Sequence, residues 1–197
     1  MLLQVNKQFN LISRSDISQV RDHHVGHCLA YALRSFPAGS TVVDWGSGGG
    51  LPAIPISILW PEVTVIAIDS NAKKTRSIDL FSRRLGLKNC STWHGRAENW
   101  SGQADYSVSR ATAPLRDLWS WHDRATDSQS QSSENAPDNC WERGLVCLKG
   151  GDLRLEIADL LSGFQECDVQ TISLNKHISD SYFDTKLLVH VTQKPNI

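Results

Sequence analysis

Runs of apolar residues divide the first half of the chain into short strands and longer helices. Thr41–Asp44 is a short stretch rich in β-branched residues, which favours a strand. Val63–Ile68 is an unbroken apolar run that ends at Asp69, and such a run is typical of a parallel strand buried on both faces. Ala72–Leu85 has helical spacing of its apolar positions and is followed by Gly86, which predicts the end of a helix.

The second half of the chain continues this alternation. Five further strands are predicted, at Ser91–His94, Tyr106–Ser109, Leu145–Leu148, Cys167–Ile172 and Leu187–Thr192. Strands that alternate with helices form an α/β sheet with right-handed crossovers. We therefore expect one domain built around a largely parallel sheet.

Two segments stand outside this alternation. Residues 1–36 combine a polar stretch with a helical segment that Asp16 can cap, which predicts a short helical cap before the main domain at 37–197. Residues 127–139 are rich in Ser, Gln and Asn and offer almost nothing to bury, which predicts a flexible surface insertion.

Composition narrows the class of protein. The chain has 197 residues, enough for one sizeable core, and 20 basic against 21 acidic side chains give a formal charge of −1. Nucleic-acid binding would therefore depend on a local basic patch. The five cysteines are odd in number and form no C-x-x-C pair, which indicates a reduced chain. Because neither a signal peptide nor a run of about 18 apolar residues occurs, we expect a cytoplasmic protein.

The stretch Asp44–Gly50 carries the first candidate chemistry, because its glycines lie directly between a predicted strand and a predicted helix. A dinucleotide fingerprint would place its third glycine where Leu51 stands, and no Gly-Lys-Ser/Thr of a Walker loop follows. Asp69, at the end of the next strand, can accept hydrogen bonds from ribose hydroxyls. Asp44 can face a cationic amino group. S-adenosylmethionine has both groups, and the alternative is a glycine-rich turn that binds nothing.

The residues around this loop resemble a known family. Val43–Ile56 is similar to the glycine loop of the small-subunit ribosomal RNA methyltransferase G family, including the two prolines after the last glycine. Further matches to family motifs are Asn6–Leu11, Asp69-Ser70 with Lys73-Lys74, Arg96-Ala97-Glu98, Ser109-Arg110-Ala111 and Leu148-Lys149-Gly150. The family usually carries more helix before Asn6, and it has an acid and a serine where this chain has His27 and Cys28.

The resemblance implies a Rossmann-like class I S-adenosylmethionine-dependent methyltransferase, with a mostly parallel central sheet, an antiparallel last strand and flanking helices. It implies methylation of N7 of a guanosine in the 530 loop of 16S ribosomal RNA. Whether the substrate is naked RNA or an assembling small subunit stays open, and we expect the protein to be a monomer. The residues that it implies at the cofactor are Gly46, Gly48, Leu51, Asp69, Ala97, Glu98 and Arg110. Ala97 and Glu98 would border the adenine, and Arg110 would lie where cofactor and RNA meet.

The sequence agrees with methylation at N7, because that nitrogen has a free lone pair and needs no general base. Tyr106–Ser109 stands where amino-group methyltransferases have their Asp/Asn-Pro-Pro-aromatic motif, and no cysteine follows a proline. Arg110 can brace a phosphate or bind the guanine edge. A structural salt bridge from Arg110 to Asp44 or Glu98 is the alternative.

Two more residues complete the predicted catalytic set. Lys73 opens a basic run, Lys73–Lys88, in which Lys73, Lys74 and Arg76 lie nearest the cofactor end and can follow RNA phosphates. The rest of the run, Arg83, Arg84 and Lys88, suits the solvated face of a helix, so only Lys73 is assigned to the site. Asn10 can hold the N-terminal loop over the cofactor or reach the base, with an Asx turn as the alternative. Lys149 is either solvated or an RNA contact, and Trp45 is expected beside the ligand.

Other functions stay open on these residues. A metal site at His23, His24, His27 and Cys28 is disfavoured because no second ligand pair follows. A methyltransferase of a small molecule or protein and a degenerate RNA-binding module remain the alternatives to an RNA methyltransferase.

Overall fold

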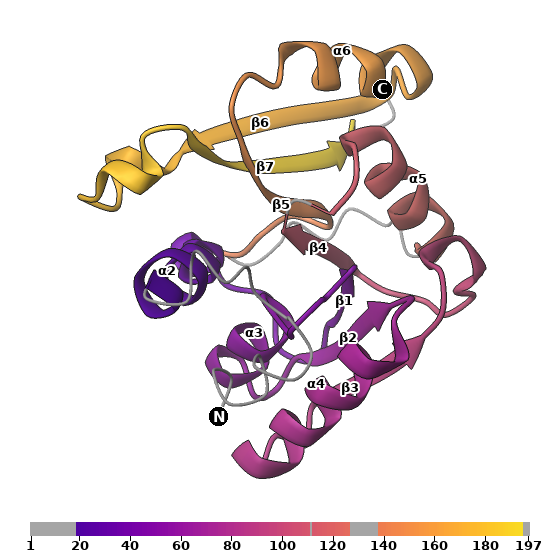
Figure 1. The fold of residues 1–197 in the computed structure, drawn as a ribbon. Coiled ribbons are helices and arrows are strands. Elements are labelled where there is room, and N and C mark those ends of the chain that lie inside the picture. The colour runs from indigo at the N-terminus through magenta and orange to yellow at the C-terminus, as the bar shows by residue number, and fades with distance from the viewer. Residues whose placement is uncertain (1–18, 111, 127–137, 195–197) are drawn as a thin grey trace.

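A seven-stranded sheet organises the structure, a computed structural model that describes residues 19–110, 112–126 and 138–194. The strand order is β3-β2-β1-β4-β5-β7-β6 (Figure 1). The strands are β1 (Thr41–Trp45), β2 (Thr64–Asp69), β3 (Cys90–His94), β4 (Tyr106–Arg110), β5 (Gly144–Gly150), β6 (Cys167–Ser173) and β7 (Lys186–Gln193). Each predicted strand is present, with its ends within two residues of the predicted ones.

Strand direction confirms the predicted fold class. The pairs β1–β2, β1–β4, β2–β3 and β4–β5 are all parallel. The last strand, β7, lies antiparallel to both of its neighbours, β5 and β6. The carboxyl ends of five strands, β1 to β5, therefore meet at one edge of the sheet, which is the edge at which open α/β sheets bind ligands.

Helices cover both faces of the sheet, and the two-residue period of the strands explains why each face has its own core. Val146 and Leu148 of β5 join one hydrophobic cluster, whereas Leu145 and Cys147 join the other. The helices are α3 (Ala53–Leu59), α4 (Ala72–Leu85), α5 (Leu115–Ala125) and α6 (Arg154–Gly163). The first cluster contains side chains of α3 and α4 and the second those of α5 and α6, so the fold has three layers.

Local chemistry explains the best-predicted helix, α4, whose ends match the prediction. The side chain of Asn71 caps its start by accepting a hydrogen bond from the Lys73 amide. Gly86 ends it with φ of 70°, a conformation that glycine adopts without strain.

The chain before β1 is helical, as predicted, but its winding changes along its length. A π-helical turn η2 (Val20–Val25), a short α2 (Gly26–Leu29) and a 3-10 turn η3 (Ala30–Leu33) follow one another. Tyr31 fixes this segment to the sheet, because its buried hydroxyl donates to the Ser109 carbonyl at 2.9 Å. The predicted domain boundary at residue 36 stays a prediction.

Several predictions fall on residues that the structure does not describe. Asn10 and Asp16 lie outside the described residues, as does most of the predicted insertion at 127–139. All five cysteines are free. In the described part of the chain, no helix is long and apolar enough to cross a membrane.

Trp45 shows why sequence position alone misplaced one side chain. Its indole is buried in the core beneath α5 and not at the ligand edge, so the prediction that it lies beside the ligand is wrong. The indole nitrogen donates to the Ser107 hydroxyl at 2.8 Å, and that oxygen lies 2.9 Å from Nδ1 of His122. Burial, with a smaller contribution from His190, lowers the pKa of His122 from 6.5 to about 3.

His122 should make the fold sensitive to acid. Its pKa is about 3 in the folded chain and 6.5 when unperturbed, so the unfolded chain binds more protons between these two values. The stabilisation that neutral His122 contributes is therefore complete above pH 6.5. Below that value the free energy of unfolding falls with decreasing pH, by about 1.4 kcal/mol per pH unit for this one group. In urea unfolding between pH 7.5 and 5, His122→Gln should reduce this slope, and His94→Gln at an exposed position should not. Equal slopes for wild type and His122→Gln would contradict the assignment.

Candidate functional site

The loop Gly46–Pro52 connects β1 to α3 at the carboxyl edge of the sheet. Its glycines at 46, 48 and 50 have φ of 69°, 55° and 86°, all in the left-handed region. Side chains rarely adopt this backbone, so the loop stays bare and a ligand can approach its amides. The sequence predicted this strand–loop–helix arrangement.

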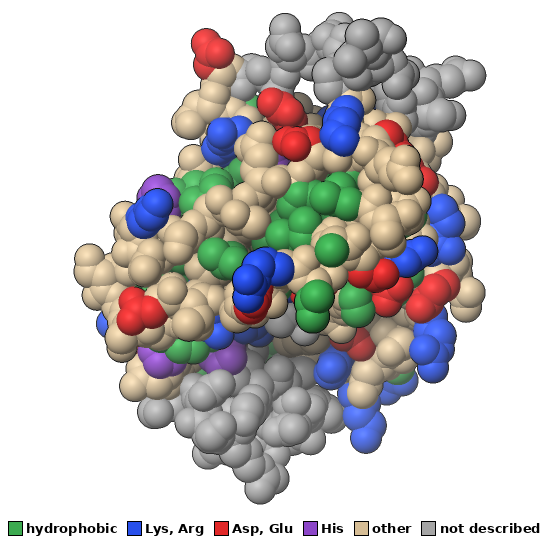
Figure 2. Space-filling view, turned by 90° about the horizontal axis from the view of Figure 1, so that it is seen from above, with side chains coloured by type: hydrophobic (Ala, Val, Ile, Leu, Met, Phe, Trp, Pro, Cys, Tyr) green, Lys and Arg blue, Asp and Glu red, His purple; other side chains and the backbone are tan. Residues whose placement is uncertain are grey.

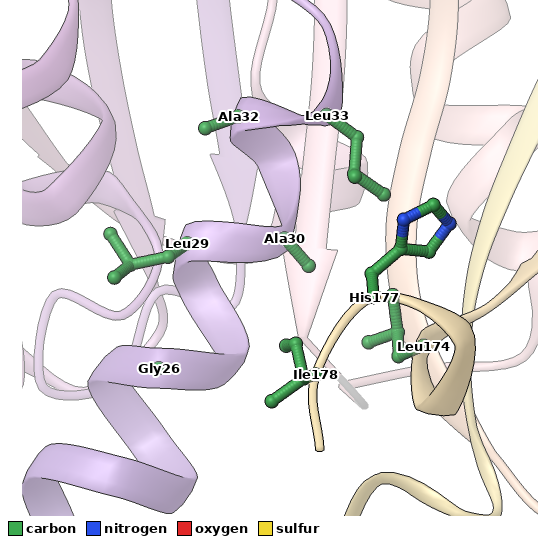
Figure 3. Close-up of a pocket in the computed structure, with 8 residues that line it drawn as sticks. All are labelled: Gly26, Leu29, Ala30, Ala32, Leu33, Leu174, His177 and Ile178. Atoms are coloured by element: carbon green, nitrogen blue, oxygen red, sulfur yellow. The ribbon is translucent and has the colours of Figure 1, made fainter.

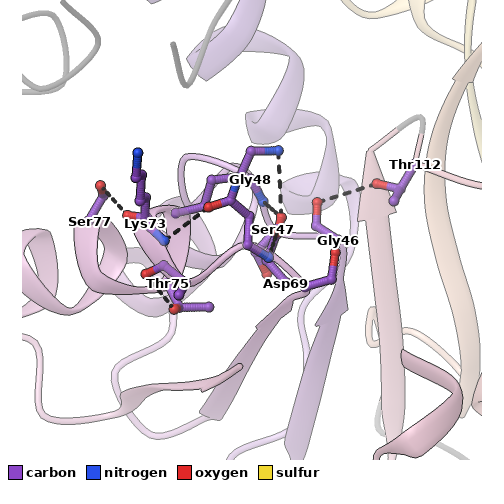
Figure 4. A network of polar contacts seen from close by, with 12 residues as sticks. Gly46, Ser47, Gly48, Asp69, Lys73, Thr75, Ser77 and Thr112 are labelled. Carbon is purple, nitrogen blue, oxygen red and sulfur yellow. Dashed lines mark hydrogen bonds and ion pairs between the residues drawn. The ribbon is translucent and has the colours of Figure 1, made fainter. Parts of the chain in front are cut away.

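Hydrogen bonds attach the loop to the end of β2 (Figure 4). The Ser47 amide donates to the Ile68 carbonyl at 2.8 Å, and the Gly48 amide donates to Oδ2 of Asp69 at 2.9 Å. The other oxygen of Asp69 accepts from the Asn71 amide at 2.8 Å, and Nζ of Lys74 lies 3.8 Å from Oδ2. The Asp69 carboxylate is thereby fixed at the loop.

Asp44 supplies a second carboxylate, beneath the loop and fully buried. Its Oδ2 accepts from the Ala53 amide at 3.1 Å, whereas its Oδ1 has no hydrogen-bond partner within the described chain. Burial raises its pKa to about 7, although hydrogen bonds from Ser47 and Ala53 and the charge of Arg110 act in the opposite direction. A buried carboxylate oxygen without a donor fits the ammonium group of a ligand such as S-adenosylmethionine.

Thr112 narrows the space above the first glycine. A Cβ placed on Gly46 would lie 2.1 Å from Cγ2 of Thr112, so only glycine fits at position 46. The Thr112 hydroxyl also lies 3.4 Å from the Gly46 carbonyl oxygen. No sequence pattern indicates this contact, because it joins the segment after β4 to the loop after β1.

Arg110 lies at the end of β4 and reaches across to the N-terminal helical segment. Its Nη1 donates to Nδ1 of His24 at 2.8 Å, and its Nε is 3.5 Å from the Leu51 carbonyl oxygen. Within the described chain it forms no ion pair with Asp44 or Glu98, so the alternative of a structural salt bridge to either is wrong. Its actual partner is a histidine that only the tertiary fold brings near.

The remaining predicted residues lie on three different parts of the fold. Leu51 is buried and packs with Val20 and Cys28. Ala97 and Glu98 form a 3-10 turn, η4 (Ala97–Asn99), after β3. Lys73 lies in the first turn of α4 with its side chain exposed.

Lys149 differs from both alternatives that the sequence suggested. It is buried, and its Nζ donates to Oε1 of Glu156 on α6 and to the Ala113 carbonyl. The same Glu156 oxygen accepts from the Leu115 amide at 2.7 Å. This ion pair fixes the segment that leads from Arg110 into α5.

Two other features of the described chain bear on ligand chemistry. No group of three or more His, Cys, Asp or Glu side chains in it is arranged to hold a metal ion. An apolar cavity of about 340 Å³ lies between the N-terminal helical segment and the turn at Leu174–Ile178 (Figure 3). It has only His177 as a titratable lining residue, so it does not extend the polar site.

The solved structures most similar in fold include several methyltransferases. A ribosomal protein L11 methylase from Lactobacillus delbrueckii subsp. bulgaricus superposes with a TM-score of 0.64 at 14% identity, over 87% of this chain and 78% of that one. Geranyl diphosphate C-methyltransferase from Streptomyces coelicolor, solved with S-adenosyl-L-homocysteine, superposes with a TM-score of 0.61 at 11% identity, over 91% of this chain and 81% of that one. The chain thus has the fold of the Rossmann-like S-adenosylmethionine-dependent methyltransferases.

Sequence comparison then identifies the family. Residues 1–132 match the family model described as GidB, rRNA small subunit methyltransferase G. Ribosomal RNA small subunit methyltransferase G of Salinibacter ruber is 49% identical over 191 residues, covering 96% of this chain and 87% of that protein. The Cytophaga hutchinsonii protein of that name is 38% identical over 188 residues, covering 94% of this chain and 84% of that protein. The chain belongs to the rRNA small subunit methyltransferase G family, whose methyl donor is S-adenosylmethionine.

Replacing Lys149 with Met should destabilise the fold, because Glu156 is left without its cation. Breaking a buried ion pair costs about 3 kcal/mol. The double variant Lys149→Met/Glu156→Gln should recover part of this loss, as measured by urea unfolding in a double-mutant cycle. A change in the free energy of unfolding of Lys149→Met within about ±0.5 kcal/mol, which is usual for surface substitutions, would contradict the structural role of this ion pair.

Proposed function

We propose that this chain methylates N7 of a guanosine in the 530 loop of 16S ribosomal RNA. The observation that carries the cofactor half of this proposal is the pair of carboxylates at the glycine loop. Asp69 is fixed by backbone amides at the end of β2, and Asp44 keeps one buried oxygen without a donor. Family membership supports the substrate.

We assign the cofactor contacts residue by residue. The bare backbone of Gly46 and Gly48 and the buried side chain of Leu51 would form the cradle. Asp69 would accept from the ribose hydroxyls, and the free oxygen of Asp44 would face the ammonium group. Ala97 and Glu98, in the turn after β3, would border the adenine.

The reaction needs little from the protein beyond alignment. When bound, S-adenosylmethionine supplies a methyl group that is already electrophilic. Guanine N7 has a lone pair and carries no proton, so no side chain has to remove one. The protein contributes by holding both reactants in line and by placing charge correctly. This agrees with a site in which glycines and carboxylates predominate.

On the RNA side, we assign Arg110 to the meeting point of cofactor and substrate and Lys73 to a phosphate near α4. Asn10 completes the predicted set and remains a sequence-based assignment. The partner is 16S ribosomal RNA, free or in an assembling small subunit. We further propose that the enzyme acts as a monomer in the cytoplasm, where ribosomal RNA is found.

The substrate is tested by mapping N7-methylguanosine in 16S ribosomal RNA from cells with and without this chain. Cells that lack the chain should lose the methyl group in the 530 loop, and re-expression of the wild type should restore it. Re-expression of Gly46→Val should not restore it, since a larger side chain collides with Thr112. An unchanged 530 loop in the deleted cells would refute the substrate.

Cofactor binding should weaken in acid because of Asp44. Its carboxyl has a pKa of about 7, so lower pH neutralises the charge that faces the ammonium group. Below pH 7, affinity measured by calorimetry should fall about tenfold per pH unit. Asp44→Asn should bind weakly with little pH dependence between 5.5 and 7.5, and Asp159→Asn on the exposed face of α6 should behave as wild type. A flat wild-type profile would contradict the role of Asp44.

A further inference from the structure

Basic side chains from three separate elements converge beside the glycine loop. His24 and His27 come from the N-terminal helical segment, Arg110 from the end of β4, and Lys186 from the start of β7. The register of β5 explains the approach of the two cations, because Arg110 pairs with Leu148 and Lys186 with Gly150. Both therefore lie at the carboxyl edge of the sheet.

The proximity of these groups appears in the titration of His27. Burial is the main cause that lowers its pKa from 6.5 to about 3, and the positive charges of Arg110 and Lys186 act in the same direction. His27 is therefore neutral at physiological pH. Its ring packs edge-on against Tyr182 and Phe183, and its Nε2 is buried without a hydrogen-bond partner in the described chain.

The Arg110–His24 hydrogen bond fixes the state of the second imidazole. A guanidinium nitrogen can only donate, so Nδ1 of His24 must accept and cannot carry a proton. His24 is then neutral, with its ring proton on Nε2. The positive charge of the cluster accordingly resides on Arg110 and Lys186.

The carboxylates near this cluster form no direct ion pair with either cation, although Asp44 is close enough to Arg110 for the two charges to interact. Neither Arg110 nor Lys186 forms an ion pair within the described chain. Asp44 lies beneath the loop and keeps its free oxygen for the ammonium group, and Asp180 accepts from the Tyr182 amide and lies 3.9 Å from His23. Nζ of Lys186 is instead 4.8 Å from the centre of the Tyr182 ring.

Two other surfaces of the described chain offer less. Hydrophobic side chains gather in patches on the face seen from above (Figure 2), and Leu155 of α6 is 87% exposed, but nothing indicates what covers them. A groove of about 500 Å³ at the opposite edge of the sheet is lined by Ile58, Leu85 and Lys88. This groove lies at the edge opposite the cofactor loop.

We propose that Arg110 and Lys186 together bind one phosphodiester group of the RNA substrate, with His24 as the positioning residue that orients Arg110. Neutral His27 is close enough to both cations for their charges to lower its pKa, and it adds no negative charge of its own to the cluster. Paired cations at a ligand edge are suited to a phosphate, and Arg contributes directional hydrogen bonds. This inference rests on the proposed function, because it presumes an RNA substrate beside the cofactor.

The test is RNA binding by the full chain. Affinity for a 16S ribosomal RNA fragment that contains the 530 loop is measured by fluorescence anisotropy across salt concentrations. Lys186→Gln should lower affinity about tenfold and reduce the salt slope by about one. Affinity for S-adenosylmethionine should not change, and Lys88→Gln at the opposite edge should bind RNA as wild type.

A further pair of variants tests the positioning role of His24. His24→Leu should raise KM for RNA with cofactor affinity unchanged, and His24→Gln should recover part of the loss because its amide oxygen still accepts from Arg110. Equal effects of the two variants would overturn the role assigned to His24.

The outcomes distinguish failure of the phosphate site from failure of the proposed RNA methylation. If the wild type neither binds nor methylates the RNA, the proposed function fails. If the wild type binds RNA and Lys186→Gln retains both its affinity and its salt slope, the phosphate site is wrong. Calorimetry with inorganic phosphate is the remaining arm: phosphate binding that Lys186→Gln abolishes without any change in RNA affinity would make this a site for free anions and overturn the inference.

Discussion

The hydrogen bond from the Gly48 amide to the Asp69 carboxylate is the constraint on which the site depends. It joins the loop after β1 to the end of β2, and the neighbouring bond from Ser47 to Ile68 reinforces it. The parallel register places both strand ends at the same edge. Only glycines with positive φ let the chain follow this path, so the loop sequence and the sheet topology require each other.

Much of the fold follows from local patterns. The strands and α4 could be predicted because their signals are short-range: β-branched runs, helical spacing and a terminal glycine at Gly86. The glycine loop after β1 and the position of Asp69 at the end of β2 could be predicted for the same reason. The surroundings of Asp44 could not be predicted, because no sequence pattern reveals that its carboxylate is buried with one oxygen lacking a donor in the described chain.

The interpretations that failed all concern side-chain partners. The alternative of a salt bridge from Arg110 to Asp44 or Glu98 failed, because the fold brings His24 to Arg110 from 86 positions away in the chain. Lys149 turned out to be buried because α6 carries Glu156 back over the end of β5. Trp45 points into the core because the alternation of β1 sends Val43 and Trp45 to one face. Such contacts depend on register and crossover, which single-residue patterns do not encode.

The separation of the hydrophobic side chains into two clusters affects which amino-acid substitutions the chain can accumulate. The backbone of the sheet stands between them, and along β5 adjacent residues serve opposite clusters. Volume changes on the two sides should therefore combine nearly additively, because residues that share no neighbours rarely couple. One layer can accumulate compensating substitutions while the other stays as it is, and the geometry of the strand ends between them is preserved.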